Sequence, residues 1–226
     1  MFQAVIFDFD GVITDSEILH LRSFNHVLSQ FNFEIGVKEY YSDYLGLSDR
    51  DLFGELIKKQ ILTVPANSVD KFLEQKKHAF EMLASTDGKI IDGVREFLTL
   101  LQKNNIAMAI CSGALLAEIE LILENADLRQ FFEVIVSADQ VKKGKPHPEG
   151  FNLSLKKLND NRNDSILPCD CVVIEDSHWG LNAAEAAGMH TVAITNSYDA
   201  DELAMAEMVV SHLNELTMTK LQQLCG

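Results

Sequence analysis

Six short apolar runs, separated by stretches with helical periodicity, constrain the fold of this chain most strongly. The first run is Ala4–Phe7, and the other five are Ile106–Cys111, Val134–Val136, Cys171–Ile174, Thr191–Ile194 and Met208–Val210. The stretches between the later runs repeat apolar residues at i, i+3, i+4 and i+7, which is typical of amphipathic helices. Short apolar strands that alternate with helices predict an α/β fold, a Rossmann-like three-layer sandwich with a parallel sheet.

Residues 16–90 break this alternation. Three helical stripes occur there, and no convincing strand lies among them. We therefore predict an inserted α-helical cap domain at 16–90 and a discontinuous core domain formed by 1–15 and 91–226. An insert that leaves the chain directly after the first strand is placed to act as a lid over a site at that strand's end.

The composition excludes several classes of function. The 226 residues include 19 basic and 34 acidic ones, and a net charge of −15 argues against nucleic acid as a partner. No apolar run approaches the ~20 residues of a membrane span, and the N-terminus enters a strand without a signal-like segment. We therefore expect a cytoplasmic protein, and without heptads or a further apolar stripe we expect a monomer.

The four cysteines are expected to be reduced thiols without a chemical role. Cys169 and Cys171 are too close in sequence for a typical zinc pair, and no second pair of ligands completes such a site. The single tryptophan, Trp179, is expected to pack against the core.

Two aspartates end the first apolar run. Asp8 and Asp10 are followed by Gly11, and a strand end delivers such side chains into the crevice where α/β proteins bind ligands. One carboxylate can attack as a nucleophile while the other handles a proton. The alternative is that these residues simply mark a turn after a strand.

Three further polar signals follow later runs. Ser112-Gly113 offers a hydroxyl and a flexible amide for a phosphate oxygen, and Lys145, between Gly144 and Pro146, offers a fixed positive charge. Glu175-Asp176 suits Mg²⁺, a hard cation that prefers oxygen ligands. Each signal also has a structural explanation: an ordinary loop, a solvated basic loop, and a helix cap made by Asp176 or Ser177.

Together, the segments DFDGV, SG, GKP and ED resemble the four motifs of the haloacid dehalogenase-like superfamily, most closely its β-phosphoglucomutase and phosphoglycolate phosphatase-like members. The resemblance covers the whole chain. It implies that Asp8 is the nucleophile that becomes an aspartyl phosphate. It implies that Asp10 is first the general acid and then the general base, which closure of the site would allow by raising its pKa.

The same resemblance implies the binding residues. Mg²⁺ would be bound by Asp8, the backbone carbonyl of Asp10 and Asp176, with Glu175 in or next to the coordination shell. The transferring phosphoryl group would be held by Ser112, the Gly113 amide and Lys145. Substrate contacts in the cap are expected from His20, Gly46, Ser48 and Arg50, with Lys76 as a further candidate. Alternatively, His20 lies on the outer face of the first cap helix.

Position 10 favours phosphate-ester chemistry, because dehalogenase-like members lack this second aspartate. The mutase-like members carry Lys before the cap glycine and Arg three residues after it, whereas this chain has Leu45 and Asp49. We therefore favour a Mg²⁺-dependent phosphatase acting on a small metabolite, such as a sugar phosphate or phosphoglycolate. A β-phosphoglucomutase-like isomerase is the alternative. A catalytically inactive binding module is a remote alternative, because every motif residue that the chemistry requires is present.

Overall fold

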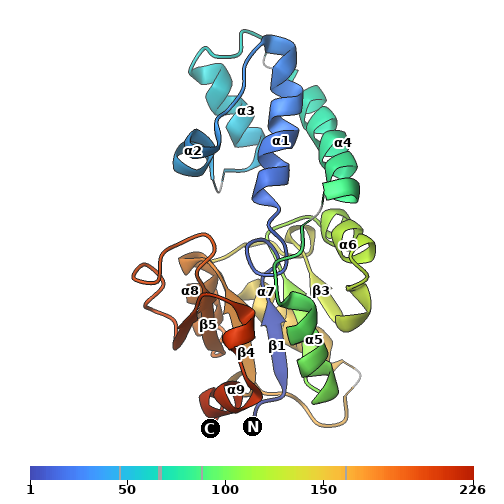
Figure 1. Cartoon of the computed structure of the whole chain (residues 1–226), viewed down its shortest axis with the longest axis vertical. Coiled ribbons are helices and arrows are strands. Elements are labelled where there is room, and N and C mark those ends of the chain that lie inside the picture. Colours follow the sequence, from blue (N-terminus) through green and yellow to red (C-terminus); the bar gives the residue numbers. More distant parts are fainter. Residues whose placement is uncertain (46, 66–67, 88, 161) are drawn as a thin grey trace. The chain divides into compact units, whose positions relative to one another are not determined.

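The computed structural model describes residues 1–45, 47–65, 68–87, 89–160 and 162–226 (Figure 1). It divides into two compact units, one formed by Met1–Asp15 with Lys89–Gly226 and the other by Ser16–Gly88. Lys89 belongs to the first unit because its carbonyl accepts hydrogen bonds from the Thr14 hydroxyl at 2.8 Å and from the Asp15 amide at 3.2 Å. Ile90 adds a β-bridge to Thr14.

The first unit is built on a six-stranded parallel sheet in the order β3-β2-β1-β4-β5-β6. Its strands are β1 Ala4–Phe7, β2 Ala107–Cys111, β3 Val134–Val136, β4 Cys171–Glu175, β5 His190–Ile194 and β6 Met208–Val210. Its α-helices are α5 Val94–Lys103, α6 Leu116–Asn125, α7 Glu149–Asn159, α8 His178–Ala186 and α9 Met218–Leu224. Every predicted strand lies at its apolar run, and the predicted Rossmann-like fold is confirmed. Helix α9 was not predicted.

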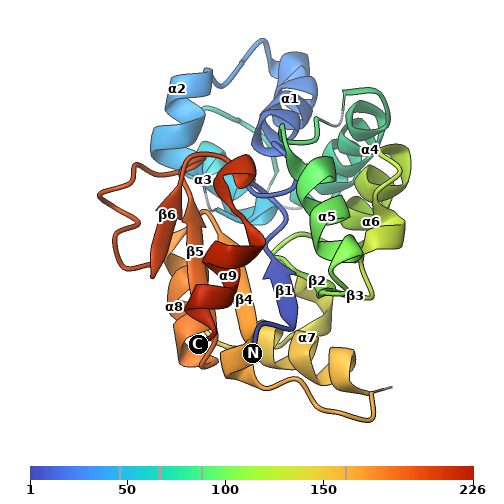
Figure 2. The same ribbon diagram turned by 60° about the horizontal axis from the view of Figure 1, so that its bottom comes forward.

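The central strand β1 is buried on both faces, which explains its continuous apolar sequence. Ala4 and Ile6 face a cluster that includes Phe151 of α7 and Ala184 of α8. Phe7 points to the opposite face, where its ring meets the ring of Phe97 of α5 at 6.1 Å. Figure 2 shows α5 and α9 on the near side of the sheet. Helices on both faces leave the carboxyl edge of the strands as the place for polar side chains.

The second unit is helical, with α1 Glu17–Leu28, α2 Val37–Glu39, α3 Asp49–Lys58 and α4 Val69–Asp87, and α1 packs against α4. A π-helical turn, Tyr40–Tyr44, follows the short α2. The core of the second unit contains Phe24, Phe53 and Phe72. The ring centroids of Phe24 and Phe53 are 5.4 Å apart, and those of Phe53 and Phe72 are 5.5 Å apart. The three longer helices match the predicted stripes, whereas α2 and the π-helical turn were not predicted.

None of the helices within the described residues is long and apolar enough to cross a lipid bilayer. The four cysteines are free thiols, of which Cys111 and Cys171 are buried.

Candidate active site

Polar side chains gather where β1, β2 and β4 end. Asp8 directly follows β1, and its amide donates a hydrogen bond of 2.9 Å to the Ile174 carbonyl of β4. Ser112 follows β2, and Glu175 is the last residue of β4. Because these three strands are adjacent and parallel, their ends meet at one edge of the sheet. The order β2-β1-β4 therefore places Asp8 in the centre of the site.

Lys145 connects two of the carboxylates. Its Nζ donates to Asp8 Oδ1 and to Glu175 Oε1, both at 2.5 Å. The loop that carries it contains a cis peptide bond between Lys145 and Pro146. A single ammonium group thus fixes the carboxylates of Asp8 and Glu175 relative to each other.

Glu175 is fully buried and every side of its carboxylate is engaged. Besides the bond from Lys145, its Oε2 accepts hydrogen bonds from the Asp176 amide, the Ser177 amide and the Ser177 hydroxyl at 3.2, 3.2 and 3.0 Å. A carboxylate offers about four lone-pair positions, so little acceptor capacity is left over. The structure thus uses Glu175 to anchor Lys145 and the turn after β4. Ser177, rather than Asp176, caps α8, because its hydroxyl accepts from the Gly180 amide at 3.2 Å.

Asp176 faces the turn that follows β1. Gly11 has φ +78°, and a Cβ built on it would lie 1.8 Å from Asp176 Oδ2. Glycine is therefore required at position 11 both for its backbone conformation and for the close approach of the carboxylate. The same Oδ2 accepts a hydrogen bond from the Ser197 hydroxyl.

The negative charge of the buried carboxylates in this site exceeds the positive charge of Lys145. Burial raises the pKa of Asp8 well above its ordinary value, and repulsion from Glu175 and Asp176 adds to this, while Lys145 opposes it. Burial and the Glu175 charge raise the pKa of Asp176 to about 7. Burial alone would lower the pKa of Lys145, but the Asp8 and Glu175 carboxylates raise it, so this lysine is cationic. Three buried acidic groups therefore face one ammonium group.

The donor set fits a hard divalent cation. One carboxylate oxygen from each of Asp8, Glu175 and Asp176 lies within 4.8 Å of the others. All three side chains are buried, so water competes little for their oxygen atoms, which are the kind of ligand that such a cation prefers. Asp10 is half-buried in the turn, where its backbone bridges to Thr14, and its charge further raises the pKa values of Asp8 and Asp176. A bound cation would balance this excess of negative charge.

Ser112 and Gly113 form an open loop beside these groups. The Ser112 amide donates to the Val136 carbonyl at 2.9 Å, and its hydroxyl accepts from the Ala114 amide at 2.9 Å. A Cβ built on Gly113 would meet nothing within 4 Å. Apart from its chain neighbours, no atom of the described residues packs against this side of Gly113.

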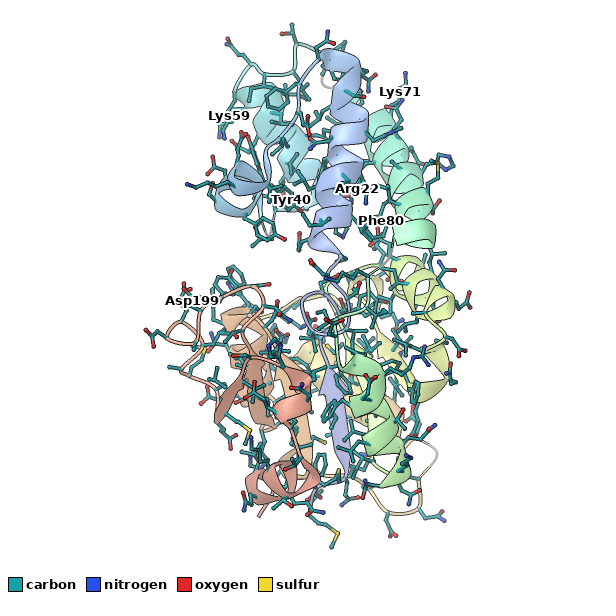
Figure 3. The ribbon with its side chains drawn as sticks, in the orientation of Figure 1. Arg22, Tyr40, Lys59, Lys71, Phe80 and Asp199 are labelled. Atoms are coloured by element: carbon teal, nitrogen blue, oxygen red, sulfur yellow. The ribbon has the colours of Figure 1, made fainter. Side chains whose placement is uncertain are left out.

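The helical unit holds the other predicted site residues. His20 Nδ1 lies 2.6 Å from Lys76 Nζ, and the His20 ring stacks on the ring of Phe80 with a centroid distance of 4.5 Å. Phe80 lies on α4 and is labelled in Figure 3. The alternative interpretation, an outer-face histidine, is therefore wrong. Burial, followed by the Lys76 charge, lowers the pKa of His20 well below its ordinary value. Gly46 lies outside the described residues.

Ser48 and Arg50 are engaged in other ways. The Ser48 hydroxyl caps α3 by accepting from the Asp51 amide at 3.2 Å. Arg50 forms an exposed ion pair of 2.6 Å with Asp70. Among the described residues of this unit, Lys76 is a buried cation: it is 1% exposed and pairs with Asp49 at 2.9 Å.

The expectation that Trp179 packs against the core is also wrong. Its side chain is 45% exposed, and its ring contacts those of His178 and Tyr198 at 4.1 and 6.3 Å. Sequence reasoning also missed Ser197. The signal was present, because Thr195-Asn196-Ser197 follows β5 as a polar strand end, like the other motifs.

Known proteins that are similar to this chain include sugar phosphate enzymes of one family. The family described as haloacid dehalogenase-like hydrolase matches residues 5–194. A phosphorylated carbohydrates phosphatase from Thermotoga maritima is 32% identical over 195 residues, covering 84% of this chain and 83% of that protein. A beta-phosphoglucomutase from Bacillus subtilis is 28% identical over 225 residues, covering 98% and 94%. The crystal structure of a putative beta-phosphoglucomutase from Thermotoga maritima superposes with a TM-score of 0.79 at 30% identity, covering 98% and 99%.

Proposed function

The chain belongs to the haloacid dehalogenase-like hydrolase family, and from that premise we propose that it is a Mg²⁺-dependent phosphatase of a small phosphorylated carbohydrate. The observation that carries the proposal is the buried Asp8 carboxylate, held by Lys145 at 2.5 Å beside Glu175 and Asp176. Phosphoryl transfer needs mainly alignment and stabilisation of charge, and this group of side chains supplies both.

In the proposed reaction, an Asp8 oxygen attacks phosphorus and the bond from phosphorus to the ester oxygen breaks. Asp10 gives its proton to the leaving oxygen, so the products of the first step are an alcohol and an aspartyl phosphate. Asp10, now ionised, removes a proton from a water molecule that attacks phosphorus. Inorganic phosphate leaves, and the Asp8 carboxylate and the Asp10 carboxylic acid are restored.

The remaining residues bind and orient. Mg²⁺ would be held by Asp8, Asp176 and the backbone carbonyl of Asp10, and when bound it would neutralise charge on the phosphoryl oxygens. Glu175 would hold Lys145 rather than serve as a ligand, because its oxygens already accept four hydrogen bonds. Ser112 and the Gly113 amide would receive the phosphoryl oxygens.

Two side chains of the helical unit favour hydrolysis over isomerisation. A mutase must hold a second phosphate group, and the mutase-like members carry Lys and Arg where this chain has Leu45 and Asp49. Leu45 packs against the apolar core of the helical unit, and Asp49 pairs with Lys76. The chain therefore lacks two cations of the mutase pattern, and Asp49 also neutralises the charge of Lys76.

We assign substrate specificity to this helical unit as a cap, with His20 and the segment around Gly46, Ser48 and Arg50 as its contact residues. Ser48 and Arg50 each already have a partner within the unit, so they would exchange those contacts on binding.

The test is phosphate release from a panel of sugar monophosphates and phosphoglycolate, with and without Mg²⁺. Asp8→Asn should abolish release, while the matched control Asp201→Asn, at an exposed loop position, should keep it. Release by Asp8→Asn at the wild-type rate would contradict the proposed nucleophile. Interconversion of β-glucose 1-phosphate and glucose 6-phosphate without release would instead identify a mutase.

A further inference from the structure

The loop after β5 contacts the site at two points that the reaction described above does not use. The Ser197 hydroxyl donates to Asp176 Oδ2, and Asn196 Nδ2 donates to the Gly11 carbonyl at 2.6 Å. The loop thus binds the acidic side chain after β4 and the backbone turn after β1 through two consecutive residues.

Asp176 Oδ2 lies close to both the turn after β1 and the loop after β5. A Cβ built on Gly11 would lie 1.8 Å from Asp176 Oδ2 and 3.2 Å from Ser197 Oγ. The turn itself is closed by a hydrogen bond of 2.8 Å from the Gly11 amide to the Thr14 carbonyl. Asp176 is therefore packed between the turn and the serine, and its carboxylate cannot rotate without disturbing one of them.

We propose that Ser197 and Asn196 are positioning residues that set the Mg²⁺ affinity of the site, an inference that rests on the proposed function. Because Oδ2 of Asp176 accepts a hydrogen bond from the Ser197 hydroxyl, Oδ1 would be the oxygen left to bind the cation. Asn196 holds the turn that carries the Asp10 carbonyl, the backbone ligand expected there. Both residues act through a ligand and contact no reacting atom.

The size of the expected effect follows from what is known of residues that hydrogen-bond to a metal ligand. Partners that orient a metal ligand typically change metal affinity by about 10- to 100-fold when they are removed. Ser197→Ala removes the hydroxyl that donates to Asp176 and leaves the Asp176 carboxylate in place. We expect an increase of about tenfold in the dissociation constant of Mg²⁺, with restoration by Ser197→Thr, which keeps the hydroxyl.

The chain contains its own reporter for this measurement. Trp179, the single tryptophan, lies three residues after Asp176. Its ring is 6.3 Å from that of Tyr198, the neighbour of Ser197. Its emission is therefore sensitive to the loop and to the end of β4.

The experiment is a Mg²⁺ titration of the full chain by calorimetry, with Trp179 emission as a second readout. The variants are Ser197→Ala, Ser197→Thr and Asn196→Ala, and the control is Ser211→Ala, at an exposed position just after β6. We expect weaker Mg²⁺ binding for both alanine variants at positions 196 and 197, and wild-type binding for the threonine variant and the control. At saturating Mg²⁺, the kcat of Ser197→Ala should stay within about threefold of the wild type, because the change acts on affinity.

An unchanged dissociation constant in Ser197→Ala would overturn the inference, as would equal weakening by the control variant. If Ser197→Ala does not fold, Ser197→Thr against Ser197→Cys makes the same comparison, since a thiol is the weaker donor. Failure of the proposed function is distinguishable: wild-type protein that binds Mg²⁺ but releases phosphate from no substrate would refute the phosphatase and leave the positioning role intact.

Discussion

Gly180 of α8 allows a direct test of how rigidly the site holds Glu175. A Cβ built on Gly180 would lie 1.8 Å from Glu175 Oε1, so Gly180→Ala must displace the carboxylate. Glu175 is 0% exposed where it lies now. The substitution therefore has two opposing effects on stability: alanine favours the helix, and displacement of Glu175 weakens the hydrogen bonds of the site.

The two effects differ in size. Alanine is favoured over glycine inside a helix by up to about 1 kcal/mol. Against this, the displaced Glu175 weakens its hydrogen bonds to the Lys145 ammonium and to the Ser177 amide and hydroxyl, and each hydrogen bond to a charged group is worth about 1.5–3 kcal/mol. We expect Gly180→Ala to lower the free energy of unfolding by about 2–4 kcal/mol.

The assay is urea denaturation followed by circular dichroism, because Trp179 emission would be disturbed by the neighbouring substitution. Gly54→Ala is the matched control: Gly54 lies within α3, and a Cβ there would meet nothing within 4 Å. It should raise stability by up to about 1 kcal/mol. Phosphatase activity should fall in Gly180→Ala only, since Lys145 loses one of its two anchors.

Equal gains in stability for the two glycine variants would refute this reasoning. That result would mean that the Glu175 carboxylate relocates without cost, and that the hydrogen bonds around it do not fix the position of Lys145.

Two further predictions concern pH and metal. His20 has a pKa held well below 6.5 by burial and by Lys76, so its contribution to stability is present above that value and is lost as the pH falls below it. His20→Gln should therefore flatten the decrease in urea midpoint between about pH 7 and pH 5, and an unchanged slope would contradict a histidine that is neutral in the folded protein. Mg²⁺ at about 100 times its dissociation constant should stabilise the protein by about 2.7 kcal/mol, measured by calorimetry and reversed by a chelator. Asp176→Asn should remove most of this gain, and a wild-type midpoint indifferent to Mg²⁺ would argue against the metal site.

The strands were predictable because a parallel sheet buried on both faces requires continuous apolar runs, and few other structures require them. The motif residues were predictable for a related reason: Asp8, Ser112 and Glu175 stand where those runs stop. The short α2 and α9 lack a long periodic stripe, so the sequence pattern carried no comparable signal for them.

The contacts between distant segments were not predictable in the same way. Ser197 meets Asp176 across 21 residues and Lys145 meets Asp8 across 137, and no local pattern encodes such pairs. Lys76 pairs with Asp49, and in the sequence Asp49 stood out only as a departure from the mutase pattern. The chemistry of each residue was therefore readable, while its partner depended on the fold.

The net charge of −15 and the site chemistry together constrain how a phosphorylated substrate can bind. Lys145 already shares its charge between Asp8 and Glu175, at 2.5 Å from each, so it has little attraction left for a dianionic phosphoryl group. Three carboxylates would repel that group in the absence of a further cation. Under the proposed function, metal and substrate must therefore bind with positive coupling, each raising the affinity of the other, because a bound cation removes the repulsion between the carboxylates and the phosphoryl group.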